Sequence, residues 1–385
     1  MKRMDEGLMI RIAPFGMDMV TSLYSLAAPL LLIDLKANPI ELGLAGGLTS
    51  AVHMTFAHRM GPFSDHFGRR RLILMAPLIL SFSCLIAMIA DRVKIILLLS
   101  ALNGLCLSLF WPPFQAWVAD RRTGLGLAKD IGTLNLAWTA AYLVGPLSSG
   151  FLFALQPRLP FLFAAAIAFL LFLLCRGSLQ DRQEKSPVKE PLASADVRPA
   201  DKRFLYVAWI ANFTSWFLLG NMRYQFPKLA RELGTRPQTV GILMACLGLS
   251  LFLGFFVLRA TSLWHFRRRY LFAAQALAAA GIAILSLSGQ TLWFALALGL
   301  VGFSASVTYY SSLLYAVQFS PGKGKGTGRH ESILSIGALT GPVLGGIAAY
   351  LAGLRAPYLV CMVFLVAAVF FELALLRRKD IPGHK

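Results

Sequence analysis

The sequence predicts an all-α membrane protein with twelve transmembrane helices arranged in two halves of six. Of the 385 residues, 57% are hydrophobic and only 14% are charged, which is far from the balance of a soluble globular domain. Apolar runs of about 20 residues, the length that crosses a bilayer, recur along the chain with polar breaks between them. Landmarks of the first half also recur in the second half at a nearly constant offset.

The apolar runs place the helices in order along the chain. In the first half we expect them at residues 12–34, 39–60, 71–90, 94–119, 131–155 and 159–176. In the second half we expect them at 203–227, 237–258, 270–288, 291–317, 330–353 and 356–376. The first run is longer than the apolar core of a signal peptide, so we expect it to be retained as a helix. Pro and Gly within these runs are tolerated because neighbouring transmembrane helices satisfy the freed backbone groups.

The two halves are indicated by an internal repeat and by a polar stretch between them. Three landmarks recur at offsets of 196 to 198 residues: Arg69-Arg70-Arg71 as Arg267-Arg268-Arg269, Pro39 and Gly43 as Pro237 and Gly241, and Gly145-Pro146 as Gly341-Pro342. Residues 177–202 are rich in Pro and charged side chains, a composition typical of a mobile linker. We therefore expect six-helix halves at 1–176 and 203–385, joined by a cytoplasmic linker.

The charge distribution predicts the orientation. The net charge is +19, but Lys and Arg lie in short clusters between apolar runs, unlike the single basic face or arm of a nucleic-acid-binding protein. Of the 37 Lys and Arg residues, 28 fall in the segments expected on one side of the membrane, and these segments include both termini. Because basic loops face the cytoplasm, we expect cytoplasmic termini in a multi-pass protein of the plasma membrane or bacterial inner membrane, with no nucleic-acid partner. The five cysteines all lie in apolar runs and indicate no disulfide.

The stretch from Gly61 to Arg71, GPFSDHFGRRR, lies between the second and third expected helices. It resembles the loop after helix 2 of the major facilitator superfamily (MFS) transporters, whose pattern is G-x-x-x-D-[RK]-x-G-[RK]-[RK]. The matching residues are Gly61, Asp65, Gly68, Arg69 and Arg70, whereas His66 stands where the family has a fixed cation. From the residue types, we expect Gly61 to permit close helix approach and Gly68 to permit a tight turn. Asp65 either pairs with Arg69 or lies near the positive end of a neighbouring helix.

The resemblance implies a conformational latch at this loop. In the family, the aspartate and a following arginine form a charge network with an acidic residue at the end of helix 4, a place that Asp120 occupies here. Asp65, Arg69 and Asp120 would then latch the halves in the outward-facing state and release when the cavity opens inward. The alternative is that the arginines only anchor the topology. In the second half the motif is degenerate, because Leu263 replaces the aspartate and Phe266 the second glycine.

Glycine and proline form a second motif, which falls in two helices. Its residues are Gly145, Pro146 and Gly150 in helix 5, and Gly337, Gly341, Pro342, Gly345 and Gly346 in helix 11. The helix 11 run matches the pattern G-x-x-x-G-P-x-x-G-G, which the family carries in helix 5 and which is associated with antiporters. Small residues let helices pack closely, and proline adds a bend that can act as a pivot. The alternative is ordinary tight packing between the halves.

Ionisable residues at membrane depth are candidates for proton coupling. Asp18 lies about six residues, or ~9 Å, into helix 1. An acidic residue there resembles the proton-coupling carboxylates of MFS drug antiporters; the alternative is an interfacial residue paired with Arg11. His53 in helix 2 either titrates near neutral pH or is a satisfied buried histidine. One departure from proton-driven members is Ser100, which stands where the family has a helix 4 arginine.

Aromatic and hydrogen-bonding side chains share helix faces, and we expect them to line a substrate cavity suited to partly apolar small molecules. They are Trp111, Gln115, Asn135, Trp138, Tyr142, Asn212, Trp216, Arg223, Tyr309 and Tyr310. The alternative for any single aromatic residue is an interfacial anchor. Arg223 either binds an anionic substrate group or extends outward to the interface. Glu331 and Glu372, near the cytoplasmic helix ends, are expected to pair with nearby Arg or Lys.

The resemblance implies alternating access, in which the two halves rock about a site near the midplane. We expect a monomeric secondary active transporter of a small organic solute that contacts membrane lipid and uses protons as the coupling ion, with proton-coupled export favoured. The alternatives are a symporter or uniporter that imports a metabolite such as an organic anion, and a non-transporting sensor or assembly subunit. Because no cluster has nucleophile, metal-ligand or phosphate-loop spacing, we expect no enzyme activity, no cofactor and no metal.

Overall fold

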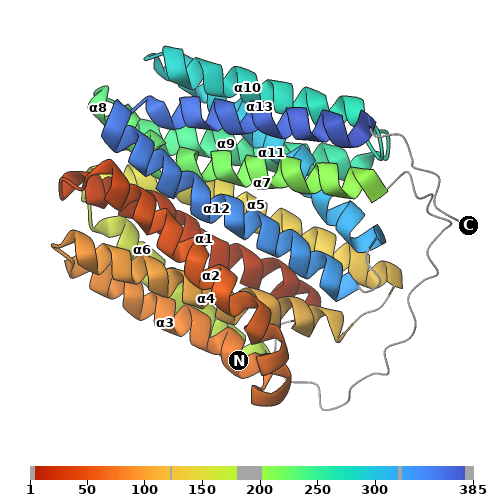
Figure 1. The fold of residues 1–385 in the computed structure, drawn as a ribbon. Helices are drawn as coiled ribbons and strands as arrows, with labels where there is room; N and C mark the ends of the chain where they lie inside the picture. The colour runs from red at the N-terminus through yellow and green to blue at the C-terminus, as the bar shows by residue number, and fades with distance from the viewer. Residues whose placement is uncertain (1–4, 122–123, 180–201, 320–322, 378–385) are drawn as a thin grey trace, which may run out of the picture.

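The computed structural model describes residues 5–121, 124–179, 202–319 and 323–377, nearly all of which are helical (Figure 1). The first six helices are α1 (Glu6–Asp34), α2 (Pro39–Phe67), α3 (Arg69–Ile89), α4 (Val93–Ala119), α5 (Gly124–Leu155) and α6 (Leu159–Ser178). They are followed by α7 (Lys202–Tyr224), α8 (Phe226–Glu232), α9 (Pro237–Ala260), α10 (Arg268–Leu287), α11 (Thr291–Phe319), α12 (Lys323–Ala352) and α13 (Ala356–Arg377). All twelve expected helices are present, and the predicted fold class is confirmed. The predicted linker lies almost entirely outside the described residues.

Ten of the described helices are long and apolar enough to cross a membrane. The other two long helices, α2 and α7, fall short because polar and charged side chains are spread along them, including His53 and Arg59 in α2 and Asn212, Asn221 and Arg223 in α7. Both pack within the bundle beside the ten apolar helices. Of these residues, His53, Asn212, Asn221 and Arg223 are buried or half-buried, whereas Arg59, near the end of α2, is exposed.

The helix ends correct two expectations about the motif at residues 61–71. Residues 61–67 are not a loop, because α2 continues to Phe67 and only Gly68 separates it from α3. Gly68 has a φ of 99°, which favours glycine, so the tight turn predicted there is confirmed. Gly61, in contrast, does not mediate a close helix approach, since a side chain built on it would meet nothing within 4 Å.

Consecutive long helices run antiparallel, so the bundle has two ends (Figure 1). The basic end carries Arg69 and Arg268, where α3 and α10 begin. The proline end carries Pro39 and Pro237, where α2 and α9 begin. Helices α1–α6 pack mainly on one another, as do α7–α13, and the two groups meet where α2 packs on α12 and α5 packs on α9.

Glycines show that the two halves are closed at the proline end. A Cβ atom on Gly43 of α2 would clash with the Pro342 backbone of α12, and one on Gly150 of α5 would lie 2.7 Å from the Gly241 Cα of α9. Towards the basic end of the same helices, Cβ atoms on Gly61, Gly132 and Gly328 would meet nothing within 4 Å. At these three positions no close helix contact is present, which agrees with a wider spacing of the halves towards the basic end.

Hydrogen bonds also cross between the halves at the proline end. The Gln225 Nε2 donates to the carbonyl oxygen of Pro39 in the first half at 3.1 Å, and also to that of Pro342 in its own half at 3.2 Å. The Lys228 Nζ donates to the carbonyl oxygen of Ala37 at 3.2 Å. Gln225 and Lys228 belong to the turn after α7 and to α8, whereas Ala37 and Pro39 lie where α2 begins. The short helix α8 thus fastens the second half to the first.

The glycines of the glycine-proline motif lie at close helix crossings. Cβ atoms on Gly337 and Gly341 would meet the α7 backbone at Phe213 and Phe217, and one on Gly346 would meet the Pro39 backbone. In α5, Gly145 lies against Ser22 of α1 and Gly150 against Gly241 of α9. Helices α5 and α12 each continue through their proline. These glycines therefore allow tight packing, within one half at Gly145, Gly337 and Gly341 and between the halves at Gly150 and Gly346, while the pivot role of the prolines stays a prediction.

Candidate functional site

A cavity of about 220 Å³ lies between the two halves. Its wall is formed by α1, α2, α4 and α5 of the first half and by α7, α11 and α12 of the second. Eight of the ten side chains predicted for a substrate cavity line it, namely Trp111, Gln115, Asn135, Trp138, Tyr142, Trp216, Arg223 and Tyr309. The two predicted proton-coupling residues, Asp18 and His53, line it as well.

Asn212 and Tyr310 do not line the cavity, and this corrects their predicted placement. Asn212 is fully buried, and neither its amide nitrogen nor its amide oxygen has a hydrogen-bond partner. Tyr310 follows Tyr309 directly and therefore points about 100° away around the helix. Its ring packs edge-on against Trp264, with 5.3 Å between ring centroids.

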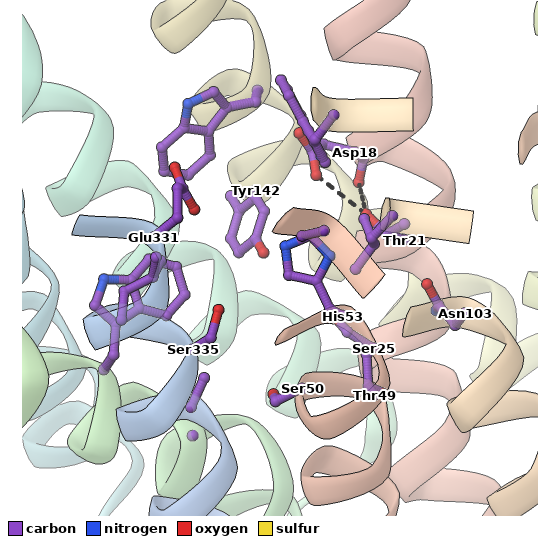
Figure 2. A pocket seen from close by; sticks show the side chains of 18 of the residues that line it. Asp18, Thr21, Ser25, Thr49, Ser50, His53, Asn103, Tyr142, Glu331 and Ser335 are labelled. Atoms are coloured by element: carbon purple, nitrogen blue, oxygen red, sulfur yellow. Dashed lines mark hydrogen bonds between the residues drawn. The ribbon is translucent and has the colours of Figure 1, made fainter. Parts of the chain in front are cut away.

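Asp18 lies in the cavity wall and is only 4% exposed (Figure 2). Its Oδ1 accepts a hydrogen bond from the Thr21 hydroxyl at 3.2 Å, while its Oδ2 has no hydrogen-bond partner. The Arg223 guanidinium lies close enough to attract the Asp18 carboxylate. This position in the cavity favours a coupling role over the interfacial alternative.

Arg223 is held between aromatic rings of both halves. Its guanidinium lies 4.6 Å from the ring centroid of Tyr142 on α5 and 5.3 Å from that of Trp216 on α7. The Nη2 nitrogen is buried and has no hydrogen-bond partner. Arg223 therefore points into the cavity and does not extend outward, and it leaves one donor for a ligand.

Trp138 connects the aromatic side chains of the cavity wall. Its ring centroid lies 5.4 Å from that of Tyr142 and 5.9 Å from that of Tyr309, so first-half and second-half rings meet here. Its Nε1 donates to the Asn135 Oδ1 at 3.1 Å. The predicted shared face of Asn135, Trp138 and Tyr142 is thus present, and it gives the cavity an apolar wall.

His53 lines the cavity from α2, and its ring is partly satisfied by α4. The Nδ1 nitrogen lies 3.2 Å from the Ser108 hydroxyl, and which of the two groups donates depends on the tautomer. A role in coupling remains a prediction for this residue.

Several polar residues of the cavity wall were not expected from the sequence: Thr21, Ser25, Thr49, Ser50, Asn103, Glu331 and Ser335. Single Ser, Thr and Asn residues are common in transmembrane helices and carry no distinctive signal.

For Glu331, the structure corrects two expectations from the sequence, a position near a helix end and an ion pair with Arg or Lys. Helix α12 begins at Lys323, so Glu331 lies about 12 Å inside it. Within the described residues, no ion pair joins Glu331 to a cation.

Glu372 is also paired differently from the expectation. It is fully buried in α13, and its Oε2 accepts a hydrogen bond at 2.6 Å from the Gln275 Nε2 of α10. Its other oxygen has no hydrogen-bond partner. An amide, not Arg or Lys, therefore satisfies this carboxylate.

The predicted charge network is formed at the basic end. Arg69 on α3 pairs with Asp65 on α2 at 2.9 Å and with Asp120 at the end of α4 at 2.8 Å. Arg70 donates to the Arg176 carbonyl oxygen of α6 at 2.8 Å. These contacts join helices of the same half. They therefore do not join the two halves directly, and the latch role of Asp65, Arg69 and Asp120 stays a prediction.

Comparisons with known proteins agree on one family. The family model of the Major Facilitator Superfamily matches residues 12–226 and 208–385. Multidrug resistance protein 2 of Bacillus subtilis is 30% identical over 164 residues, which are 41% of this chain and 41% of that protein. The quinolone resistance protein NorA of Staphylococcus aureus is 22% identical over 158 residues, again 41% of each chain. The matches thus span about two fifths of these relatives.

Solved structures share the fold over nearly the whole chain. A bacterial homologue of the human lysosomal transporter Spinster, in an inward-facing and unoccupied conformation, has a TM-score of 0.73 at 16% identity and covers 96% of both chains. The nucleoside transporter NupG has a TM-score of 0.75 at 12% identity, over 98% of this chain and 100% of its own. The human organic anion transporter MFSD10 has a TM-score of 0.67 at 18% identity, over 97% of this chain and 100% of its own. At these identities the likeness establishes the fold alone.

Proposed function

This chain belongs to the Major Facilitator Superfamily, and we propose that it is a secondary active transporter that exports small amphipathic organic compounds in exchange for protons. The observation that carries the proposal is a central cavity whose wall is shared by both halves and contains an enclosed carboxylate, Asp18. In alternating access, a site between two rocking halves is exposed to one side of the membrane at a time.

The closed proline end and the separated basic end support alternating access. A state that is closed at one end and open at the other is one of the two that the mechanism requires. The basic end carries most of the Lys and Arg, and such loops face the cytoplasm. We infer that the structure represents the state open to the cytoplasm, from which an exporter takes its substrate.

Proton coupling is supported by the surroundings of Asp18. A carboxylate that is 4% exposed and has one unpartnered oxygen is costly to keep charged unless a cation or proton is close. Arg223 supplies a cation when Asp18 is charged, and a proton replaces that interaction when it is not. The names of the multidrug and quinolone resistance relatives agree with export of amphipathic compounds.

Arg223 also supports a second candidate function, the import of an organic anion. Arg223 lines the cavity, its Nη2 has no hydrogen-bond partner, and an arginine fork suits a carboxylate or phosphate group. In that case Arg223→Ala abolishes transport of the anion, and uptake proceeds together with a cation or down the gradient of the anion.

The charge network of Asp65, Arg69 and Asp120 has a local role in this proposal. The Asp65 and Asp120 side chains are 46% and 40% exposed, and such pairs contribute only about 0–1 kcal/mol each. Pairs this weak do not hold two halves in one state on their own. We infer that they brace α2, α3 and α4 against one another while the first half moves as a unit.

Transport by the purified full chain in lipid vesicles tests the proposal. An imposed pH gradient should drive accumulation of a fluorescent amphipathic compound, and Asp18→Asn should abolish the dependence on the gradient. Asp91→Asn is the matched control, because it removes an aspartate that is 76% exposed at the proline end, outside the cavity. Flux of an organic anion with no response to Asp18→Asn would support the second candidate. Absence of flux for every compound class would refute transport.

A further inference from the structure

Glu331 is a carboxylate in the cavity that the proposed exchange at Asp18 does not use. It enters the cavity from α12 of the second half, whereas Asp18 enters from α1 of the first half. Figure 2 shows the two side chains on different sides of the cavity, with the Tyr142 ring between them in this view. The cavity thus holds one carboxylate from each half.

The two carboxylates have different neighbours. Asp18 accepts a hydrogen bond from Thr21 and is attracted by Arg223, so a cationic ligand must compete there with a built-in cation. Glu331 forms no ion pair with any cation whose side chain the structure describes. Its charge lies near the Tyr309 hydroxyl instead. A charged carboxylate without a counter-ion in a low-dielectric cavity is stabilised when a ligand supplies one.

The walls around Glu331 suit the rest of such a ligand. The Tyr309 ring lies 5.9 Å from Trp138 and 6.3 Å from Trp216, measured between ring centroids. The three rings thus lie together, and aromatic faces attract organic cations and stack with aromatic ligands. Glu331 also precedes Leu334, Ser335 and Ala338 along α12, so it lies nearest the basic end of the cavity-lining residues of that helix. A ligand entering from the separated end therefore meets Glu331 first on α12.

We propose that Glu331 is the residue that selects organic cations, while Asp18, paired with Arg223, exchanges the proton. The inference rests on the proposed function and adds a division of roles between the two halves. The ligand class is an aromatic or quaternary organic cation whose charge lies against Glu331 and whose rings lie against Trp138, Trp216 and Tyr309.

Binding of two probes of equal shape and opposite charge tests this division. Tetraphenylphosphonium and tetraphenylborate would be titrated against the purified full chain near pH 6 and pH 8. Glu331→Gln should weaken tetraphenylphosphonium binding by about tenfold or more, the loss expected when one nearby opposite charge is removed, without weakening tetraphenylborate binding. Glu331→Asp should retain the preference for the cation. Asp18→Asn should keep that preference and lose its pH dependence.

Glu372→Gln is the control, because it makes the same substitution in the same half at a carboxylate that does not line the cavity. Unchanged tetraphenylphosphonium binding in Glu331→Gln would overturn the inference, as would an equal loss for both probes, which indicates a structural role. A wild-type protein that exports only neutral compounds in vesicles would overturn the inference alone. Absence of any flux would overturn the proposed function as well.

Discussion

The contacts that close the proline end predict how the conformational equilibrium responds to substitution. The Gln225 amide and the Lys228 ammonium donate across the interface to the Pro39 and Ala37 carbonyl oxygens. Opening this end breaks both hydrogen bonds and exposes the groups to water. Gln225→Leu and Lys228→Met remove the donors and leave the side-chain volumes similar. Both substitutions should therefore favour the state that is open at the proline end.

The magnitude follows from the two donors. A neutral hydrogen bond contributes about 1 kcal/mol net, and one from a charged donor contributes about 1.5 kcal/mol at the low end of its range. Only bonds present in one state shift the equilibrium, and both are specific to the closed proline end. Losing both changes the free-energy difference by about 2.5 kcal/mol, which is roughly a 70-fold change in the ratio of the two states.

Distances between spin labels at the proline end measure this ratio. Labels at Asp91 in the first half and Arg236 in the second lie at exposed positions, and Cys246, the one partly exposed native cysteine of the described residues, would be replaced by Ala. The double variant should populate longer distances than the wild type. Glu232→Gln is the control, since it removes the partner of Lys228 at 3.9 Å within the second half and leaves both interface bonds intact. Identical distance distributions for the double variant and the wild type would refute the reasoning.

Two further predictions concern packing. Gly150→Leu should hold α5 away from Gly241 and lengthen the same label distances. Gly61→Leu, whose side chain meets no neighbour, is the control and should leave these distances unchanged. The prediction is wrong if the two variants behave alike. Gln275→Leu strands the buried Glu372 carboxylate and should lower stability by about 1–3 kcal/mol, while the double change Gln275→Leu with Glu372→Leu should recover most of it. Thermal unfolding in detergent measures both variants, and equal destabilisation would contradict the role of the pair.

The helices and the central cavity could be predicted because their signals are regular. Runs of apolar residues place a membrane helix without knowledge of its neighbours. Asn135, Trp138 and Tyr142 recur at helical spacing, and all three line the cavity. The spacing fixes a shared face before the partner of that face is known.

Helix ends and helix rotation were harder to predict, and the errors at the site follow from them. The Gly61-Pro62 pair favours a helix end, yet α2 continues through Pro62 and includes most of the expected loop. The polar first turns of α12 do not resemble a membrane segment, so the sequence predicted a helix that begins at residue 330. Glu331 was therefore expected at the helix end, although it lies well inside α12. Asn212 matches the spacing of its face, but the packing of the second half buries it away from the cavity. That outcome depends on tertiary contacts that one helix does not encode.

The two long helices that are least apolar, α2 and α7, both contribute polar residues to the cavity. Helix α2 contributes Thr49, Ser50 and His53 to the cavity, and α7 contributes Trp216 and Arg223. A helix that faces lipid gains nothing from such residues, since unpaired polar groups in hydrocarbon are costly. A helix that packs inside the bundle has both a polar cavity to line and neighbours to pack against. The polar content that lowers the hydropathy of α2 and α7 below that of a typical span therefore comes in part from the residues that line the cavity.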